Sequence, residues 1–519
     1  MYLTVLVTSL TLMHAPEDPQ PWYRNHSKHP FYLHKKFSLN SATARQSRKF
    51  RSIAAFPWTR ESPAGFWYDG DTSLNPDDWE KIVNDYSDAV VVGGDPNEVY
   101  IFFLRSAKHP IRIKLPEQKA CDYGLPTDKI NVAWTLKTDE SFQPIIVITN
   151  RYLIYIYSIR ENKIVSILRG HGNHITSIVV HPSVPYMFAT TSRDFSTRLY
   201  DLKQKPKQRP NNPVWPPQNK PSLAGGAHGL DGNDPEGYYR DEGWGRCVMV
   251  LAGGPSGGHQ GDVFAAAFHK HYPVIATCGM DRAVKIWHIP FPFLPDQKLV
   301  REDKPLFSST TIHKARVLSI DWISDDILLT HSAPAIMSIP ATDDEHPDIE
   351  PAYMVLWRWL GKDRFFPVGW NEHPSQQTAL RGCASDYQES ASFQILASIN
   401  LSPTPTQFDT PSAFHVFREE NHDPLLLYTY PQWKRVTIVN IADFPPRRPP
   451  PCRWMTDEEL LEAARKLNIS EVDEDVPSWQ IELTDPTDAF QTCTMFPEGD
   501  AIVAAGGYHV WVWRKYPTD

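Results

Sequence analysis

Two segments of this chain repeat each other in spacing, and an internal repeat of this length limits the folds open to the sequence. The first runs from Gly170 to Asp201 (GHGNHITSIVVHPSVPYMFATTSRDFSTRLYD), and the second from Gly258 to Trp287 (GHQGDVFAAAFHKHYPVIATCGMDRAVKIW). Each begins with a Gly-His pair and contains three short apolar runs separated by turn residues. An aromatic residue follows the histidine after 29 positions in the first and 28 in the second. Three short strands per repeat indicate an all-β protein built from similar sheets.

Each segment also carries four polar or aromatic side chains at matching offsets. They are His171, Thr190, Asp194 and Tyr200 in the first segment, and His259, Thr277, Asp281 and Trp287 in the second. These offsets are typical of a WD40 propeller blade, where such side chains can form one hydrogen-bonded chain. A buried polar network is tolerated only when every member has a partner, so its recurrence favours WD40 blades over chance similarity.

Weaker repeats flank the two clear ones. One joins FRSIAAFPW to VVVGG and VYIFFL, one begins at Asn131, and another runs from Ile312 to Trp359. Further on, FQILASIN and AFHVFRE are expected to form paired strands, and a last repeat ends at Lys515. Seven blades of about 40–45 residues would occupy roughly 300 residues. The sequence therefore predicts a seven-bladed WD40 β-propeller over residues 50–515.

Proline accounts for 47 of the 519 residues, well above the average of about 5%. This excess predicts long Pro-rich insertions between or within blades. We place them at about 202–245, 338–352 and 402–480. Within the last insertion, Thr456 and Glu459 form a capping box that predicts one short helix over roughly 457–468. The helix would either dock a partner or pack on its own propeller.

The charge distribution separates the N-terminal part from the rest. The formal net charge is −9, which argues against nucleic-acid binding by bulk charge. Residues 1–49 are nevertheless expected to form an N-terminal extension that is basic from residue 24, since nine Lys/Arg and no Asp/Glu lie between Arg24 and Arg60. The candidate contacts to nucleic-acid phosphates are Arg45, Arg48, Lys49 and Arg51. The alternative is a basic tail that lies on the acidic remainder.

Several chemical classes are disfavoured by the sequence. The six cysteines lie at least 31 residues apart, so a disulfide framework or zinc clip is not expected. Gly254–Gly258 matches G-x-S-x-G, but a β-run follows it where a nucleophile elbow needs a helix. His269 and His271 lack a matching set of metal ligands. No run of 18 apolar residues exists to span a membrane. We therefore expect no catalytic residues, metal site or cofactor.

Several strings go beyond the general repeat. They are RGHGNHITSIVVHP, TCGMDRAVKIW, FSSTTIHKARVLSIDWISDDILLTHS and AFQTCTMFPEGDAIVAAGGYHVWVWRK. These strings resemble the embryonic ectoderm development/extra sex combs family, the WD40 subunit of Polycomb repressive complex 2. The resemblance covers most of residues 50–515 outside the insertions, and the insertions mark a divergent member.

This resemblance implies a function without catalysis. The chain would be a nuclear scaffold of a histone H3 lysine 27 methyltransferase complex, and would take part in transcriptional repression. Its partners would be the SET-domain catalytic subunit and other subunits of the complex, with the histone H3 tail or nucleosome as a further candidate. The alternative is a generic WD40 adaptor in ubiquitin ligation, RNA processing or trafficking.

The family also implies a trimethyl-lysine site. In better-known members an aromatic cage holds this group by cation–π attraction. By alignment, two cage positions fall at Ser52 and Ile130, and a third lies near 382–388, where Tyr387 is the only aromatic residue. Ser52 and Ile130 offer no ring, so we expect a degraded cage. Phe56, Trp58 and Tyr387 form the alternative set that could rebuild one.

Overall fold

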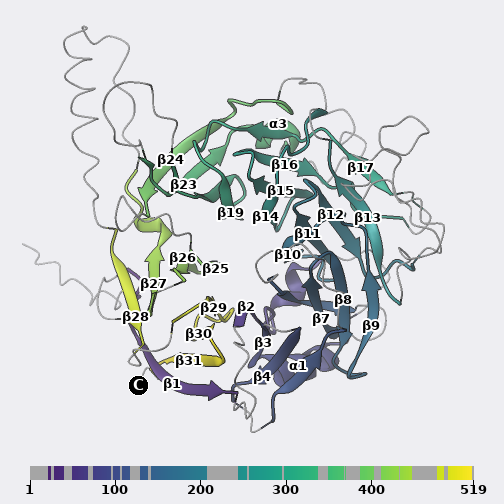
Figure 1. Ribbon diagram of the computed structural model, residues 1–519, viewed down its shortest axis with the longest axis vertical. Coiled ribbons are helices and arrows are strands. Elements are labelled where there is room, and N and C mark those ends of the chain that lie inside the picture. The colour runs from purple at the N-terminus through teal and green to yellow at the C-terminus, as the bar shows by residue number, and fades with distance from the viewer. Residues whose placement is uncertain are drawn as a thin grey trace, which may run out of the picture.

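Seven of the sheets formed by the described strands stand around one axis as the blades of a propeller (Figure 1). This confirms the predicted all-β fold and the predicted number of blades. The computed structural model describes residues 21–24, 29–39, 50–67, 74–94, 97–105, 108–116, 129–137, 142–206, 243–253, 256–294, 297, 299–336, 349–367, 369, 386–401, 411–431, 433–446, 476–483 and 489–516.

The first four blades follow one another along the chain, each with its first strand nearest the axis. Blade 1 contains β2 (Phe50–Ala55), β3 (Ala89–Gly94), β4 (Glu98–Phe103) and β5 (Ile111–Lys114). Blade 2 contains β6 (Asn131–Lys137), β7 (Gln143–Asn150), β8 (Leu153–Ser158) and β9 (Lys163–Leu168). Blade 3 contains β10 (Ile175–Val180), β11 (Met187–Ser192), β12 (Thr197–Asp201), β13 (Arg246–Leu251) and a parallel fifth strand, β17 (Val300–Glu302). Blade 4 contains β14 (Val263–Phe268), β15 (Val274–Gly279), β16 (Val284–His288) and β18 (Phe307–Ser309).

The remaining blades complete the ring. Blade 5 contains β19 (Val317–Trp322), β20 (Ile327–Ser332), β23 (Tyr353–Trp359) and β24 (Phe393–Asn400). Blade 6 contains β25 (Ala413–Glu419), β26 (His422–Thr429), β27 (Arg435–Asn440) and β28 (Ser478–Glu482). Blade 7 contains β29 (Thr492–Met495), β30 (Ala501–Gly506), β31 (His509–Lys515) and β1 (Phe31–Ser38). A separate ribbon contains β21 (Ala335–Ile336) and β22 (Ile349–Glu350).

The ring closes through a strand from the opposite end of the chain. β1 runs antiparallel to β31, from Phe31 opposite Lys515 to Ser38 opposite His509 (Figure 1). The prediction that residues 1–49 lie outside the propeller is therefore wrong for this strand. The outer strand of a blade is exposed to water, and β1 accordingly has His-Lys-Lys at its centre. Such a polar sequence resembles that of a solvated tail, which is why the strand was not predicted.

The predicted insertion at 402–480 also contains a blade. β25 to β28 of blade 6 begin or end within it, and β25 pairs with β26 rather than with β24. The prediction that FQILASIN and AFHVFRE pair with each other is therefore wrong, since these strands belong to successive blades. The predicted helix over 457–468 lies outside the described residues, as do most of the predicted insertions at 202–245 and 338–352.

Short helices lie between the strands. Among the described residues they are η1 (Ser62–Gly65), α1 (Pro76–Tyr86), α3 (Lys362–Phe365) and η5 (Ile441–Asp443). Asn75 caps α1 by accepting a hydrogen bond from the Asp77 backbone N–H, and Pro76 occupies the first turn. Trp79 and Val83 bury the inner side of α1 against blades 1 and 2. In the described part of the chain, no helix is long and apolar enough to cross a membrane.

Candidate functional site

Blade 4 contains a continuous hydrogen-bonded chain through the four side chains singled out in its sequence. The Trp287 indole N–H donates to the Thr277 hydroxyl oxygen at 2.8 Å, and Thr277 in turn contacts Nε2 of His259 at 2.8 Å. Nδ1 of His259 lies 3.0 Å from both carboxylate oxygens of Asp281. Burial alone would raise the pKa of Asp281, but the His259 ring and its hydrogen bond outweigh burial and hold the pKa below its ordinary value.

Blade 3 has the same arrangement with one change. His171 contacts Asp194 and Thr190, each at 2.8 Å. Tyr200 does not join them, because its hydroxyl donates to the Arg169 carbonyl at 3.4 Å and its ring stacks on another aromatic residue of the core. The structure therefore brings together three of the four predicted members in this blade.

Blade 5 contains a third, incomplete network that the sequence analysis did not assign. Nε2 of His313 lies 2.7 Å from the Thr330 hydroxyl, and the Trp357 N–H donates to the same hydroxyl at 3.2 Å. His313 and Trp357 are 44 residues apart, because the β21–β22 ribbon is inserted between β20 and β23. The sequence therefore lacks the short histidine-to-aromatic spacing of the two clear repeats. The histidine-to-threonine spacing of 17 residues is close to the 19 and 18 of blades 3 and 4, so this spacing could have identified the network from the sequence.

We expect Asp281→Ala to lower the free energy of unfolding by about 1–3 kcal/mol, because it leaves the buried His259 Nδ1–H without an acceptor. Urea or thermal unfolding measures this loss. The matched control is Asp363→Ala, because that carboxylate pairs with Lys362 at 3.3 Å and is 86% exposed. The control should stay within about 0.5 kcal/mol of wild type. Equal stability of the two variants would contradict a role for the network.

The same carboxylate should contribute to acid unfolding. The pKa of Asp281 is lower in the folded protein than its ordinary value, so its stabilising contribution is present above about pH 4. The contribution is lost as the pH falls through the folded-state pKa. The difference in free energy of unfolding between wild type and Asp281→Ala should therefore become smaller as the solution is acidified, which urea unfolding at a series of pH values measures.

Of the three positions aligned with the methyl-lysine cage, Ser52 and Ile130 lie side by side, whereas Tyr387 lies in another part of the propeller. A Cβ atom added to Gly93 would lie 2.5 Å from Oγ of Ser52 and 3.1 Å from Cγ2 of Ile130. Tyr387 instead lies under the ammonium of Lys304, 5.4 Å from its ring centroid, and close to Gly257. The structure thus joins Ser52 and Ile130 at blades 1 and 2 and leaves Tyr387 near blades 4 and 5.

The alternative aromatic set does not surround an open space. Phe56 is 0% exposed and Trp58 is 6% exposed, and both pack in the core between blades 1 and 2. The Phe56 ring contacts Trp58 and Trp134 edge-on, at centroid distances of 5.2 Å in both cases. Their ring faces are therefore covered by protein, which leaves no room for an ammonium group between them.

Of the four candidate phosphate contacts, the structure describes one. Arg45, Arg48 and Lys49 lie outside the described residues. Arg51 lies in β2, the strand of blade 1 nearest the axis, and is half-buried. It is therefore part of a blade rather than of an exposed tail.

Comparison with known proteins finds a repeat family and several proteins to which this chain is similar. A family model described as "WD domain, G-beta repeat" matches residues 162–201 and 245–288. The Polycomb protein EED of Chaetomium thermophilum is 25% identical over 188 residues, which is 36% of this chain and 26% of that protein. The Polycomb group protein FIE1 of Zea mays is 26% identical over 157 residues, 30% of this chain and 25% of that protein. Over about a third of its length, the chain is therefore similar in sequence to the EED and FIE Polycomb proteins.

Two further comparisons qualify this relationship. A chain in the crystal structure of the Chaetomium thermophilum Polycomb repressive complex 2 has a TM-score of 0.55 and 16% identity, covering 94% of this chain and 98% of that chain. A probable cytosolic Fe-S cluster assembly factor of Schizosaccharomyces pombe is 26% identical over 170 residues, 31% of this chain and 26% of that protein. The sequence alignments span about a quarter of each of these curated relatives.

The two histidines singled out in the sequence, His269 and His271, lie in a turn. Nδ1 of His269 accepts hydrogen bonds from the backbone N–H groups of His271 and Tyr272, both at 2.9 Å. His271 contacts Asp325 at 2.9 Å. Burial lowers the pKa of His269 to about 3, so the ring is neutral at physiological pH. Across the described ranges, no group of three metal-ligating side chains comes together.

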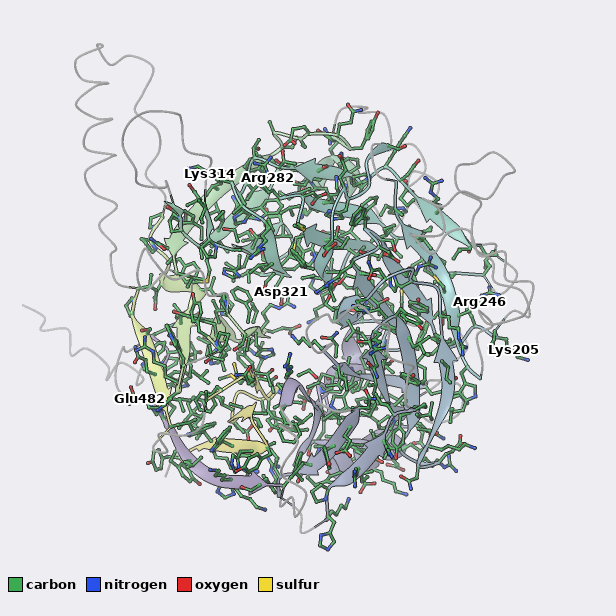
Figure 2. All side chains as sticks on the ribbon, in the orientation of Figure 1. Lys205, Arg246, Arg282, Lys314, Asp321 and Glu482 are labelled. Atoms are coloured by element: carbon green, nitrogen blue, oxygen red, sulfur yellow. The ribbon has the colours of Figure 1, made fainter. Side chains whose placement is uncertain are left out.

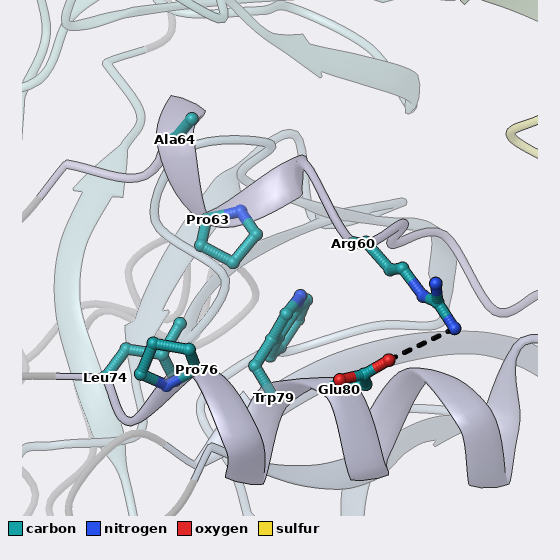
Figure 3. Close-up of a pocket in the computed structure, with 7 residues that line it drawn as sticks. All are labelled: Arg60, Pro63, Ala64, Leu74, Pro76, Trp79 and Glu80. Carbon is teal, nitrogen blue, oxygen red and sulfur yellow. Dashed lines mark ion pairs between the residues drawn. The ribbon is translucent and has the colours of Figure 1, made fainter.

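An apolar hollow lies between η1 and α1 (Figure 3). Its cavity volume is about 580 Å³, and its lining residues are Arg60, Pro63, Ala64, Leu74, Pro76, Trp79 and Glu80. Arg60 and Glu80 form an ion pair at 3.3 Å on one side. The Trp79 N–H already donates to the Thr59 carbonyl, so the hollow offers mainly van der Waals contact.

Proposed function

We propose that this protein is the non-catalytic propeller scaffold of a nuclear, Polycomb-type histone H3 lysine 27 methyltransferase complex. The observation that carries the proposal is the agreement of two independent comparisons. Sequence similarity points to EED and FIE proteins, and the fold follows a chain of Polycomb repressive complex 2 over 94% of this chain. The SET-domain catalytic subunit would be its principal partner.

The chemistry of the described residues favours a scaffold over an enzyme. The histidine–aspartate pairs of the blade networks are enclosed, as in His171–Asp194, where neither side chain is exposed. Such pairs hold strands together and do not face a substrate. A propeller instead offers two ends and an outer rim, on which several partners can bind at once.

Reconstitution of the complex tests this proposal. The purified protein alone should methylate no histone, and its co-expressed SET-domain partner should lose most of its activity when this chain is omitted. Methylation of nucleosomes measures both results, and an unrelated WD40 protein in place of this chain is the matched control. Full activity without this chain would contradict the scaffold role.

The alternative is a WD40 adaptor in another assembly, and similarity to Fe-S cluster assembly factors supports keeping it. Affinity purification from native cells distinguishes the two functions. Recovery of a SET-domain subunit supports the Polycomb scaffold. Recovery of cytosolic Fe-S assembly proteins, a ubiquitin ligase or a vesicle coat without that subunit supports the adaptor.

A further inference from the structure

The segment between β2 and β3 carries most of the net negative charge of the chain. Residues 60–88 contain eight Asp/Glu and two Lys/Arg, a net charge of −6, whereas the net charge of all 519 residues is −9. The same segment contains η1 and α1 and forms the apolar hollow between them (Figure 3). A hollow with acidic surroundings attracts a positively charged ligand.

The walls of this hollow are fixed to three blades. The buried rings of Phe66 and Trp79 pack edge-on at a centroid distance of 5.8 Å, and Phe66 lies parallel to Phe142 of blade 2 at 6.3 Å. The Trp67 backbone N–H donates to the Ser183 carbonyl of blade 3 at 2.8 Å. A ligand would therefore not have to order the walls of the hollow, which lowers the entropic cost of binding.

The walls offer apolar contact to a ligand. Pro63 and Leu74 are half-buried, and Ala64 and Pro76 are exposed (Figure 3). The cavity volume of about 580 Å³ lies within the range of about 300–1,000 Å³ that is typical of ligand pockets. Since these side chains have no hydrogen-bonding groups, the complementary group is a large aliphatic or aromatic side chain.

Carboxylates outnumber cations at the rim of the hollow. Glu80 lines it and pairs with Arg60 at 3.3 Å, and Arg60 also donates to Asn84 at 3.2 Å. Asp77 precedes Glu80 by three positions, so the two side chains are neighbours on the surface of α1. Asp77 and Asp78 are both exposed, and neither pairs with a cation among the residues that the structure describes. The rim therefore has carboxylates available for an incoming Lys or Arg side chain.

The basic segment of this chain is tethered at the opposite end of β2. The backbone N–H groups of Leu39 and Phe50, which flank residues 40–49, donate to the turn between β30 and β31, beside the start of β2. The hollow instead follows the end of β2 at Ala55. A segment of ten residues held at both ends would have to cross the height of the blade and return within its extended length. This arrangement favours a separate molecule as the occupant.

We propose that the hollow between η1 and α1 binds a basic peptide segment of a partner protein. One large apolar side chain of the peptide lies in the hollow, and flanking Lys or Arg side chains lie beside Asp77 and Glu80. The apolar walls supply contact area, and the carboxylates supply electrostatic complementarity. A nucleic acid or an acidic peptide would be repelled by the same carboxylates. The inference does not rest on the scaffold role.

Fluorescence anisotropy with the full-length chain tests this site. The probe is a labelled peptide of Lys and Arg residues with one central phenylalanine. One comparison probe has alanine in place of the phenylalanine, and the other has glutamine in place of every Lys and Arg. The alanine probe should bind at least about tenfold more weakly, because it leaves the hollow unfilled. The glutamine probe should also bind more weakly, and added salt should weaken binding of the basic probe.

Two variants of the chain test the walls and the rim separately. Ala64→Trp fills the hollow from an exposed position and should weaken binding of the phenylalanine probe at least about tenfold. Its matched control is Leu360→Trp, which places the same side chain at a position of blade 5 that is 54% exposed. Glu80→Gln should weaken binding about two- to fivefold, the range for an exposed ion pair. Its matched control is Asp363→Asn, and both controls should bind as wild type does.

Equal binding of the phenylalanine and alanine probes would overturn the proposal, as would wild-type affinity of a folded Ala64→Trp variant. Two further outcomes would overturn the assignment to a partner protein. Self-association of the chain in analytical ultracentrifugation, abolished by Ala64→Trp, would assign the hollow to a second copy. Tighter binding of the probe after deletion of residues 40–49 would assign it to the basic segment of the chain itself.

Discussion

Phe31→Ala is expected to lower the free energy of unfolding by about 3–5 kcal/mol, the range for truncating a large aromatic side chain in a core. Phe31 is 3% exposed and belongs to a core cluster formed mainly by blades 6 and 7. Its ring lies 5.4 Å from that of Trp22, which in turn contacts Trp479 at 5.1 Å. The side chain therefore anchors the N-terminal segment at the junction of the two blades.

The same segment closes the ring, so its loss should affect the whole propeller. β1 supplies the outer strand of blade 7, and the Arg24 guanidinium pairs with Asp423 of blade 6 at 2.5 Å. Asn440 donates to the Tyr23 carbonyl at 2.9 Å. Removal of residues 1–39 would expose the edge of β31 to water and would leave buried aromatic side chains without cover.

Unfolding in urea measures the effect of Phe31→Ala, and Leu33→Ala is the matched control. Leu33 lies in the same strand but is 47% exposed, so its truncation should cost no more than about 0.5 kcal/mol. A synthetic peptide of residues 21–39 should restore stability to the truncated chain, because strand pairing needs no covalent link. Identical unfolding curves for Phe31→Ala and Leu33→Ala would refute closure by β1.

The blade networks show what spacing alone can predict. In blade 4, the histidine, threonine, aspartate and tryptophan are close in the chain, so their offsets specify one hairpin geometry. In blade 3, the exchange of tryptophan for Tyr200 keeps the core packing but moves the polar atom to Arg169. The identity of one side chain thus decided whether the predicted hydrogen bond formed.

The missed features depend on contacts between distant residues. β1 pairs with a strand more than 470 residues away, and its basic sequence gives no alternating pattern. Blade 6 lacks the Gly-His start, so β25 was assigned to an insertion. α1 was also missed, although Asn75 and Pro76 are ordinary helix-start residues. Tyr387 was assigned to the cage by alignment across a variable stretch, and its contacts lie at Lys304 and Gly257.

The propeller is expected to bind trimethyl-lysine peptides weakly or not at all. Each ring face in a desolvated cage contributes about 0.5–2 kcal/mol, so two missing rings correspond to a loss of about 5- to 1,000-fold in affinity. Ser52 and Ile130 provide none of this attraction. Phe56 and Trp58 are enclosed in the core, and Tyr387 already faces the Lys304 ammonium.

Calorimetric titration of the full-length protein with trimethylated and unmethylated histone H3 peptides measures this prediction. The two peptides should give the same weak heat, and Tyr387→Ala should change neither. To show that the protein stays folded during the experiment, its thermal unfolding transition is measured before and after the titration, and the two transitions should match. Tight binding of the trimethylated peptide alone, lost in Tyr387→Ala, would show that the cage is intact in a different geometry. If the expected result holds and the assembled complex still responds to the mark, the response must come from another subunit.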